Sequence, residues 1–273
     1  MKRLLFLITS SLFLISLTTE AQFWLPAGGR SAGMGSASVS LSDFWSSHNN
    51  QAGMAFYKKP AAGFYLENHF LLREMSYEAA SATVPTRYGV FGLNLAYSGD
   101  KNYSTLNSGL AYALSLGSRF AAGIQLDFLH ARLAENYGSR FMPSFEAGLL
   151  AKINDQLSFG AHVFNPVQVK AEEAYDGRVP AIMNAGFSYN FSDKLLLTAE
   201  VCKHSEFPVE FGAGAEYQFF QKGFVRLGLT TNPFRYTFGF GLRLDKLHTD
   251  VSSSVHEALG ASPGASFYYE FAE

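Results

Sequence analysis

The chain has 273 residues, of which 21 are basic and 23 acidic, and its formal net charge is −2 at pH 7. This balance leaves no polybasic patch and excludes a nucleic-acid partner from our expectations. Aromatic residues make up 15% of the chain, charged residues only 16%, and there are 25 glycines, a composition that suits a protein whose outer face meets lipid.

The first 21 residues have the organisation of a secretory signal peptide. Lys2 and Arg3 precede an apolar run, and Thr19 and Ala21 are small residues at the third-last and last positions before Gln22. We therefore expect cleavage after Ala21 and export of the mature chain. No later apolar run approaches the ~20 residues of a membrane-spanning helix, so a mature chain that crosses a membrane must do so as a barrel.

Residues 22–59 are rich in Gly, Ala and Ser and precede the first predicted strand, with Ser42 and Asp43 as a possible helix cap. We interpret this segment as an N-terminal hatch that folds into the lumen of a barrel, the alternative being a periplasmic tail. The candidate hatch and lumen residues are Arg30, Asp43, Trp45, Asn50, Gln51, Ala52 and Gly53.

From about Pro60 to Phe271, large apolar side chains alternate with small or polar ones in short units that end in turns. In residues 91–98, for example, Phe, Leu, Leu and Tyr alternate with Gly, Asn, Ala and Ser. Fourteen strands are predicted, near residues 60–70, 73–84, 88–98, 107–116, 119–132, 141–152, 156–164, 181–191, 194–203, 208–220, 222–230, 235–245, 247–256 and 264–272. An even number suits a single-chain barrel.

The connections between these strands alternate in length. Short ones occur at residues 116–119, 154–156, 192–193 and 221–223, with the Gly, Asn, Asp and Ser residues that hairpin turns require. Most of the others are longer, and the longest covers residues 165–180. This parity predicts short periplasmic turns and longer outer loops.

Alternation alone also fits a soluble sandwich, whose large residues would point inward. Composition and the aromatic strand at residues 266–271 favour a membrane barrel instead. The predicted fold is therefore all-β, a transmembrane antiparallel β-barrel of about 14 strands with a small N-terminal hatch. Its organisation is a signal peptide at 1–21, a hatch at 22–59 and the barrel at 60–273.

Charged residues recur on the strand faces opposite the large apolar residues. The candidate lumen residues are Glu67, Asp127, Glu146, Glu200, Glu216, Arg226 and Arg243. An Arg on the lipid face near the midplane would cost roughly 2–4 kcal/mol, so we expect Arg226 and Arg243 to face inward. We interpret the set as a structural charge network that braces wall and hatch, with Arg30 as a partner, and a substrate-selecting site is the alternative.

The histidines are scattered, and none has the spacing of a metal site, so we expect no metal and no cofactor. Asp127 and His130 lie on opposite faces of one predicted strand. Ser158 and His162 share a face but have no identifiable third partner. The chain is therefore not expected to be an enzyme.

Residues 32–43, AGMGSASVSLSD, are followed at 50–55 by NQAGMA. These stretches resemble the opening of the FadL-like superfamily, particularly its PorV/PorQ branch, which leads to an Asn-Pro-Ala-Gly-Leu-Ala motif. Gln51 stands in the position of the family Pro, and Met54 in that of the Leu. The resemblance continues through RVP at 178–180, AEV at 199–201, GAEY at 214–217, RLGL at 226–229 and LG at 259–260.

This resemblance implies a 14-stranded barrel in the lipid of the outer membrane, with an N-terminal hatch. The PorV/PorQ branch implies an accessory component of protein export or surface attachment by type IX secretion, with a larger outer-membrane or periplasmic protein complex as its partner. The alternative is a FadL-like transporter of hydrophobic small molecules, which would bind a hydrophobic ligand. A second alternative is a plugged structural barrel without cargo.

Overall fold

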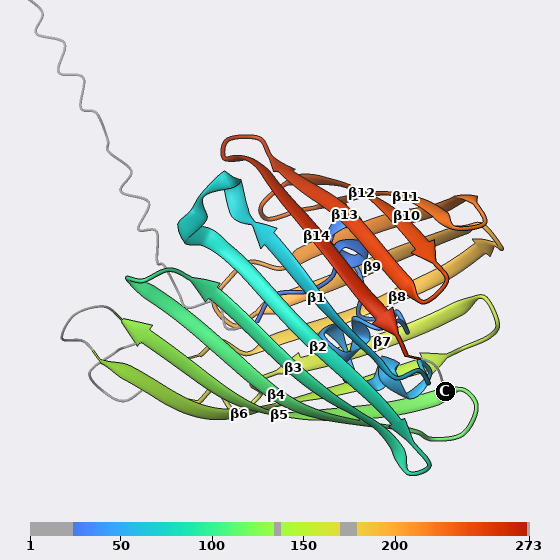
Figure 1. Cartoon of the computed structure of the whole chain (residues 1–273), viewed down its shortest axis with the longest axis horizontal. Helices are drawn as coiled ribbons and strands as arrows, with labels where there is room; N and C mark the ends of the chain where they lie inside the picture. Colours follow the sequence, from blue (N-terminus) through green and yellow to red (C-terminus); the bar gives the residue numbers. More distant parts are fainter. Residues whose placement is uncertain (1–23, 134–137, 170–178, 272–273) are drawn as a thin grey trace, which may run out of the picture.

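The computed structural model describes residues 24–133, 138–169 and 179–271, so the predicted signal peptide lies outside the described residues. Fourteen strands form a closed antiparallel barrel in which every strand pairs with its neighbours along the chain, and β1 (Ala61–Asn68) pairs with β14 (Gly260–Glu270). Figure 1 shows the ring, with the N-terminal segment inside it. The prediction of a 14-stranded transmembrane barrel with a hatch is confirmed.

The remaining strands are β2 (Ser76–Thr86), β3 (Gly89–Gly99), β4 (Tyr103–Ser115), β5 (Phe120–Leu133), β6 (Ser139–Lys152), β7 (Leu157–Phe164), β8 (Ile182–Ser192), β9 (Leu195–His204), β10 (Glu210–Phe220), β11 (Gly223–Thr230), β12 (Arg235–Leu244) and β13 (Leu247–His256). The helical turns are α1 (Gly29–Gly33), α2 (Ser46–Asn49), η1 (Gln51–Ala55), η2 (His69–Leu71) and η3 (Arg73–Met75). No helix within the described ranges is both long and apolar enough to cross a membrane.

Two strands begin about four residues earlier than predicted. β4 starts at Tyr103 instead of residue 107, and β14 starts at Gly260 instead of residue 264. Both extensions lack a regular alternation of large apolar residues, which is typical of a loop, yet their serines Ser104 and Ser262 are buried in the lumen. Inward polar side chains are compatible with a strand wherever the lumen offers them polar surroundings.

The distribution of side chains is the reverse of that in a soluble sandwich. In β3, Phe91 and Leu93 are 50% and 46% exposed on the outside, while Gly92 and Asn94 are buried inside. The same alternation recurs around the ring, so the outer face is a continuous apolar surface. A closed ring leaves no strand edge unpaired, which is what a barrel in hydrocarbon requires.

We call residues 24–59 the hatch. It enters at the end of the barrel that carries the longer loops, where Trp24 packs with Phe164 and Val179. It leaves at the end with the short turns, where the Lys59 ammonium lies 2.6 Å from the Glu270 carboxylate. Between these points α1 packs on β11 to β14, and η1 packs on β3 to β6. The hatch therefore crosses the whole lumen (Figure 1).

Small residues on the inner wall let the hatch backbone lie directly against the strands. A Cβ atom added at Gly160 of β7 would come within 2.1 Å of the Val39 carbonyl oxygen, and one at Gly228 of β11 within 2.4 Å of the Gly35 nitrogen. Larger side chains at these positions would force the hatch off the wall. The glycines of the inner wall therefore make room for the hatch backbone.

The outward orientation of the apolar residues can be tested by depth. Leu110 lies in the middle of β4 and Leu116 lies in the turn that follows, and the two are 58% and 56% exposed. We expect Leu110→Arg to lower the unfolding free energy of the barrel in lipid vesicles by roughly 2–4 kcal/mol and Leu116→Arg by about 0–1 kcal/mol. Urea titration of vesicle-embedded protein measures both, and equal losses would contradict a lipid-facing wall.

Candidate functional site

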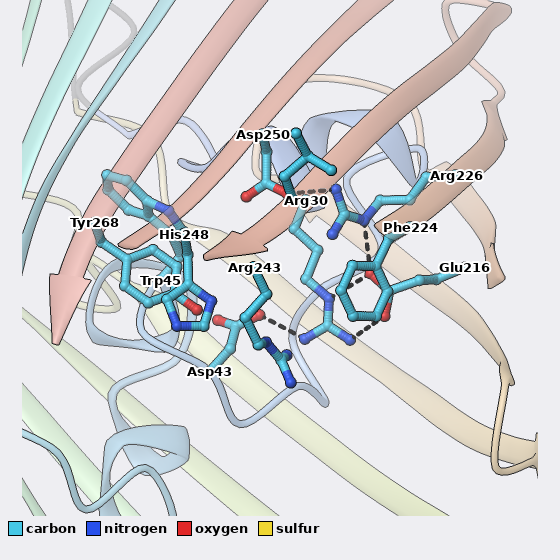
Figure 2. Close-up of a pocket in the computed structure, with 11 residues that line it drawn as sticks. Arg30, Asp43, Trp45, Glu216, Phe224, Arg226, Arg243, His248, Asp250 and Tyr268 are labelled. Carbon is cyan, nitrogen blue, oxygen red and sulfur yellow. Dashed lines mark hydrogen bonds and ion pairs between the residues drawn. The ribbon is translucent and has the colours of Figure 1, made fainter. Parts of the chain in front are cut away.

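Five charged residues join the hatch to the wall near the turn end, and we call them the ion-pair cluster: Arg30, Asp43, Glu216, Arg226 and Asp250 (Figure 2). The Arg30 guanidinium donates to both oxygens of Glu216, at 2.9 and 2.6 Å, and to Asp43 at 2.9 Å. Arg226 donates to Glu216 and to Asp250, both at 2.6 Å. Arg30, which Asp43 holds from within the hatch, is thereby bound to β10, and Arg226 of β11 links β10 to β13.

The charges of the ion-pair cluster are almost balanced, with two guanidinium groups and three carboxylates. Side chains of the Arg226 pairs are 4% to 9% exposed, so removing one partner would leave a buried charge unpaired. The adjacent cavity measures only about 50 Å³, little more than the ≈ 30 Å³ that one water takes up in the liquid. The cluster is therefore an attachment point for the hatch and no place for an organic ligand.

A second set of polar contacts, the amide–carboxyl cluster, holds the middle of the hatch: Gln51, Gln125, Asp127, Glu146 and His162. Gln51 is fully buried and donates to the Glu146 carboxylate at 2.6 Å. His162 Nε2 lies 2.8 Å from the same Glu146 oxygen. Gln125 donates to Glu146 at 3.0 Å and to Asp127 at 2.8 Å. Gln51, which stands where the related motif has Pro, thus anchors η1 to β6 with its side chain.

The other predicted hatch residues lie near these anchors. The Asn50 side-chain amide donates to the carbonyls of Val39 at 2.6 Å and Leu149 at 3.1 Å, and its oxygen accepts from the Ala52 nitrogen at 3.2 Å. Gly53 leaves no room for a Cβ, which would lie 2.6 Å from the Leu41 carbonyl oxygen. Trp45 is 2% exposed. These residues fix the fold of the hatch on the inner wall.

Two predicted carboxylates lie on the loop side of the hatch. Glu200 accepts from the backbone nitrogens of Ser38 and Val39, at 2.7 and 2.8 Å. Glu67 accepts from the Tyr65 hydroxyl at 2.6 Å. Both side chains line a larger cavity.

This outer cavity has a volume of about 280 Å³ and lies between the hatch and the loop ends of the strands. Its apolar lining comes mainly from Trp24, Leu25, Pro26, Ala32, Phe70, Met75 and Pro233. Its polar lining includes Glu67, His69, Asn184, Glu200, Cys202, His204, Glu210 and Arg235. A concave site with apolar walls and a few polar groups is the usual form of a small-molecule site.

The predicted lumen charges do not form a single network. Glu216 and Arg226 belong to the ion-pair cluster, Asp127 and Glu146 to the amide–carboxyl cluster, and Glu67 and Glu200 to the outer cavity. Arg243 lies at the rim of the small cavity beside the ion-pair cluster, with its guanidinium over the Phe224 ring at 5.2 Å. Asp250 was missed, although its position in the alternation of the strand at 247–256 places it on the inward face.

His48 occupies a buried aromatic stack in the hatch. Its ring lies parallel to that of Trp24, with centroids 6.2 Å apart, and its Nε2 lies 2.8 Å from the Leu25 carbonyl oxygen. Burial lowers the pKa of His48 to about 4. The imidazole is therefore neutral in the closed hatch near pH 7.

No family model matches this chain, and no curated protein matches it. Solved structures do match. The CymD monoaromatic hydrocarbon channel aligns over 91% of this chain and 98% of its own, with a TM-score of 0.75 and 12% identity. The toluene transporter TbuX of Ralstonia pickettii aligns over 90% and 98%, with a TM-score of 0.74 and 11% identity. A FadL homologue of Pseudomonas aeruginosa aligns over 92% and 100%, with a TM-score of 0.68 and 14% identity.

At these identities the similarity concerns the fold alone. The chain has the fold of these barrels, and the predicted resemblance is supported as far as the fold. The names of the three structures describe a channel, a transporter and a FadL homologue rather than enzymes. The PorV/PorQ branch, which the sequence motifs favoured, receives no support from them.

The ion-pair cluster predicts a strong effect of one amide substitution. Glu216→Gln removes the carboxylate that Arg30 and Arg226 share, although they keep Asp43 and Asp250, and we expect a loss of roughly 1–3 kcal/mol in unfolding free energy. The matched control is Asp245→Asn, which removes an exposed pair with Lys222 and is expected to leave stability unchanged. Urea unfolding in detergent measures both losses. Two equal losses would contradict the claim that the buried ion-pair cluster stabilises the fold.

His48 is expected to make the closed hatch less favourable in acid. A released hatch exposes His48, whose usual pKa is near 6.5, whereas the buried imidazole of the closed hatch stays neutral down to about pH 4. The contribution of His48 to closure therefore falls by roughly 3 kcal/mol in total as the pH drops from about 6.5 to 4.

Single-channel conductance of the reconstituted barrel reports hatch opening. Between pH 7.5 and 4.5, the frequency of openings should rise more, or fall less, in the unmodified barrel than in His48→Phe, which keeps a flat ring against Trp24. An identical pH profile in the two proteins would rule out His48 as a source of it.

Proposed function

We propose that this protein is an outer-membrane transport barrel that takes up a small, largely apolar molecule through its outer cavity. The observation that carries the proposal is the cavity itself, about 280 Å³ between the hatch and the loop ends of the barrel. An engineered cavity of about 150 Å³ is enough to bind benzene in another protein, so the outer cavity has room for a substituted aromatic ring.

The fold supports the same proposal. The CymD structure is named a monoaromatic hydrocarbon channel and TbuX a toluene transporter, and both align with nearly the whole described chain. The transporter alternative therefore fits the comparisons better than the secretion accessory, which gains no specific observation from the fold. The plugged structural barrel remains the outcome that a failed binding test would favour.

In this proposal the hatch separates two compartments. The outer cavity lies on one side, and a polar mouth of about 610 Å³ at the turn end lies on the other, lined by Ser42, Arg119 and Lys152 among others. Arg30 borders this mouth and also belongs to the ion-pair cluster. Passage of a ligand along the lumen would require the hatch to move away from that cluster.

The proposal includes the route to the membrane. We propose that residues 1–21 are a signal peptide removed after Ala21, and that the barrel is inserted in the outer membrane, where its apolar outer face contacts lipid. Isolation of the native protein from outer-membrane fractions, with N-terminal sequencing, would test both parts.

A bulky residue in the outer cavity should abolish binding. Ala32 on α1 lines the outer cavity, and Ser42 of the same hatch lines the mouth at the turn end. We expect Ala32→Phe to weaken saturable binding of radiolabelled toluene to proteoliposomes at least about tenfold, a loss of about 1.4 kcal/mol, and Ser42→Phe to leave it unchanged.

Binding is corrected for toluene that partitions into protein-free vesicles, and correct folding of each variant is checked by heat-modifiable mobility in gels. Saturable binding that survives Ala32→Phe would place the ligand elsewhere. Absence of saturable binding in the unmodified barrel would favour the plugged structural barrel.

A further inference from the structure

We infer that the outer cavity selects molecules that combine an apolar body with an uncharged or cationic head group that donates hydrogen bonds, such as an alcohol or an amine, and that it rejects carboxylates. This inference rests on the proposed function, because it names the class of ligand for the same cavity. Three features of the lining carry it: its charge, its unpartnered polar atoms and their position beside an apolar wall.

Carboxyl groups outnumber guanidinium and ammonium groups in the lining. Glu67, Glu200 and Glu210 contribute three carboxyl groups, and Arg235 is the only arginine or lysine among the described lining residues. Arg235 is already engaged, since it donates to Glu210 at 2.9 Å and to the Thr230 hydroxyl at 3.1 Å. No guanidinium or ammonium group of the described lining is thus left to receive a carboxylate ligand.

Glu67 and Glu200 keep accepting capacity toward the cavity. The hydrogen bonds of Glu200, from Ser38 and Val39, both go to Oε2, and the Tyr65 hydroxyl bonds to Oε2 of Glu67. The other oxygen of Glu67 lies 3.7 Å from His69 Nδ1, which is beyond hydrogen-bond distance. A donating head group would find acceptors here, whereas a carboxylate has no hydrogen to donate to them.

Three buried polar atoms of the lining lack a partner, which points independently to a ligand. They are the indole Nε1 of Trp24, the Oδ1 of Asn184 and the Nε2 of His69, none of which has a hydrogen-bond partner in the described structure. Trp24 and Asn184 are each 4% exposed and are the more deeply buried of the three residues. Leaving such groups unpaired costs about 1–3 kcal/mol each, and a hydroxyl group can donate to one and accept from the other.

The apolar part of the lining determines the chemistry of the ligand outside its head group. The side chains of Leu25, Pro26, Phe70 and Met75 form walls without hydrogen-bonding groups. An aromatic or short alkyl body would bury its surface there, while its head group turns toward β8 and β9, where Asn184 and Cys202 are paired neighbours. A hydrocarbon without a head group would leave the polar atoms unpaired.

The test uses four ligands with one phenylethyl body: propylbenzene, 2-phenylethanol, 2-phenylethylamine and 3-phenylpropanoate. Cys202 is the only cysteine of the chain and lines the outer cavity, so protection of its thiol from a methanethiosulfonate reagent reports occupancy of this cavity. Protection is measured in proteoliposomes against the free ligand concentration, after correction for partition into lipid.

We expect the alcohol and the amine to protect Cys202 at concentrations at least about tenfold below that of the carboxylate. The Asn184→Leu variant should weaken protection by the alcohol and leave that by propylbenzene unchanged. The matched control is Asn190→Leu, on the same strand and the same inward face but at the turn-end mouth, and it should change neither.

The charge of the cavity can be read without any ligand. A trimethylammonium-bearing methanethiosulfonate should modify Cys202 faster than a sulfonate-bearing one, by a larger ratio than the two reagents show with a free thiol in solution. Glu67→Gln should lower that ratio.

The possible outcomes distinguish a failure of the head-group selectivity from a failure of the proposed function. Protection by the carboxylate equal to or better than that by the alcohol and amine would overturn the selectivity. Protection by propylbenzene with no advantage for the donor ligands would overturn it as well and leave the proposed function standing. Protection by none of the four ligands, with Cys202 still reactive, would count against the proposed function itself.

Discussion

The pairing of β1 with β14 is the interaction on which the rest of the structure depends. Seven residue pairs, from Ala61 with Glu270 to Glu67 with Gly264, join the ends of the sheet into a ring. In hydrocarbon each unpaired backbone group costs several kcal/mol, so a sheet with two free edges would not be stable there. Once the ring closes, every strand must present one face to lipid and the other to an enclosed lumen.

That requirement explains the unusual placement of the side chains. Large residues such as Leu110 and Phe91 lie outside, and polar or small ones such as Asn94 and Gly228 lie inside. A 14-stranded ring lined by small residues is too wide to be filled by its own wall. The hatch fills it, and it can approach so closely because the wall offers glycine where the hatch backbone passes.

The hatch is held mainly by polar contacts, which differ along its length. Near the turn end, Arg30 of the hatch pairs with Glu216 of the wall and with Asp43. In the middle, the Gln51 side-chain amide donates to the Glu146 carboxylate. Toward the loops, the Glu200 carboxyl group accepts hydrogen bonds from the backbone N–H groups of Ser38 and Val39, and the outer cavity begins there. The space for a ligand is therefore found at the end of the lumen where no ion pair joins the described residues of the hatch and the wall, and the ion-pair cluster lies on the other side of the hatch.

The strand pattern could be predicted from sequence because its period depends on neighbouring residues only. Residues 91–98 reveal two faces without any knowledge of their partners, and the inward position of Arg226 follows from the same alternation. The boundaries of β4 and β14 were less accurate, since buried serines in a polar lumen look like loop residues.

The contacts within the lumen could not be predicted in this way. Arg30 could be named as a partner of the inward charges, but Glu216 lies 186 residues away, and nothing local shows that Arg30 pairs with it rather than with another carboxylate. Gln51 differs from the Pro of the related motif, yet its role depends on Glu146, 95 residues away. Likewise, the close approach of Gly160 to Val39 and of Gly228 to Gly35 follows from the closed fold and cannot be seen in the local sequence.

The most direct test of ligand binding in the outer cavity is a crystal structure of the barrel grown with 2-(4-bromophenyl)ethanol, in which anomalous scattering locates the bromine. We expect a bromine peak in the outer cavity beside Trp24 and Asn184, with the hatch in the lumen and Arg30 bound to Glu216. Bromine found only on the lipid-facing surface, or a hatch that lies outside the barrel, would contradict this expectation.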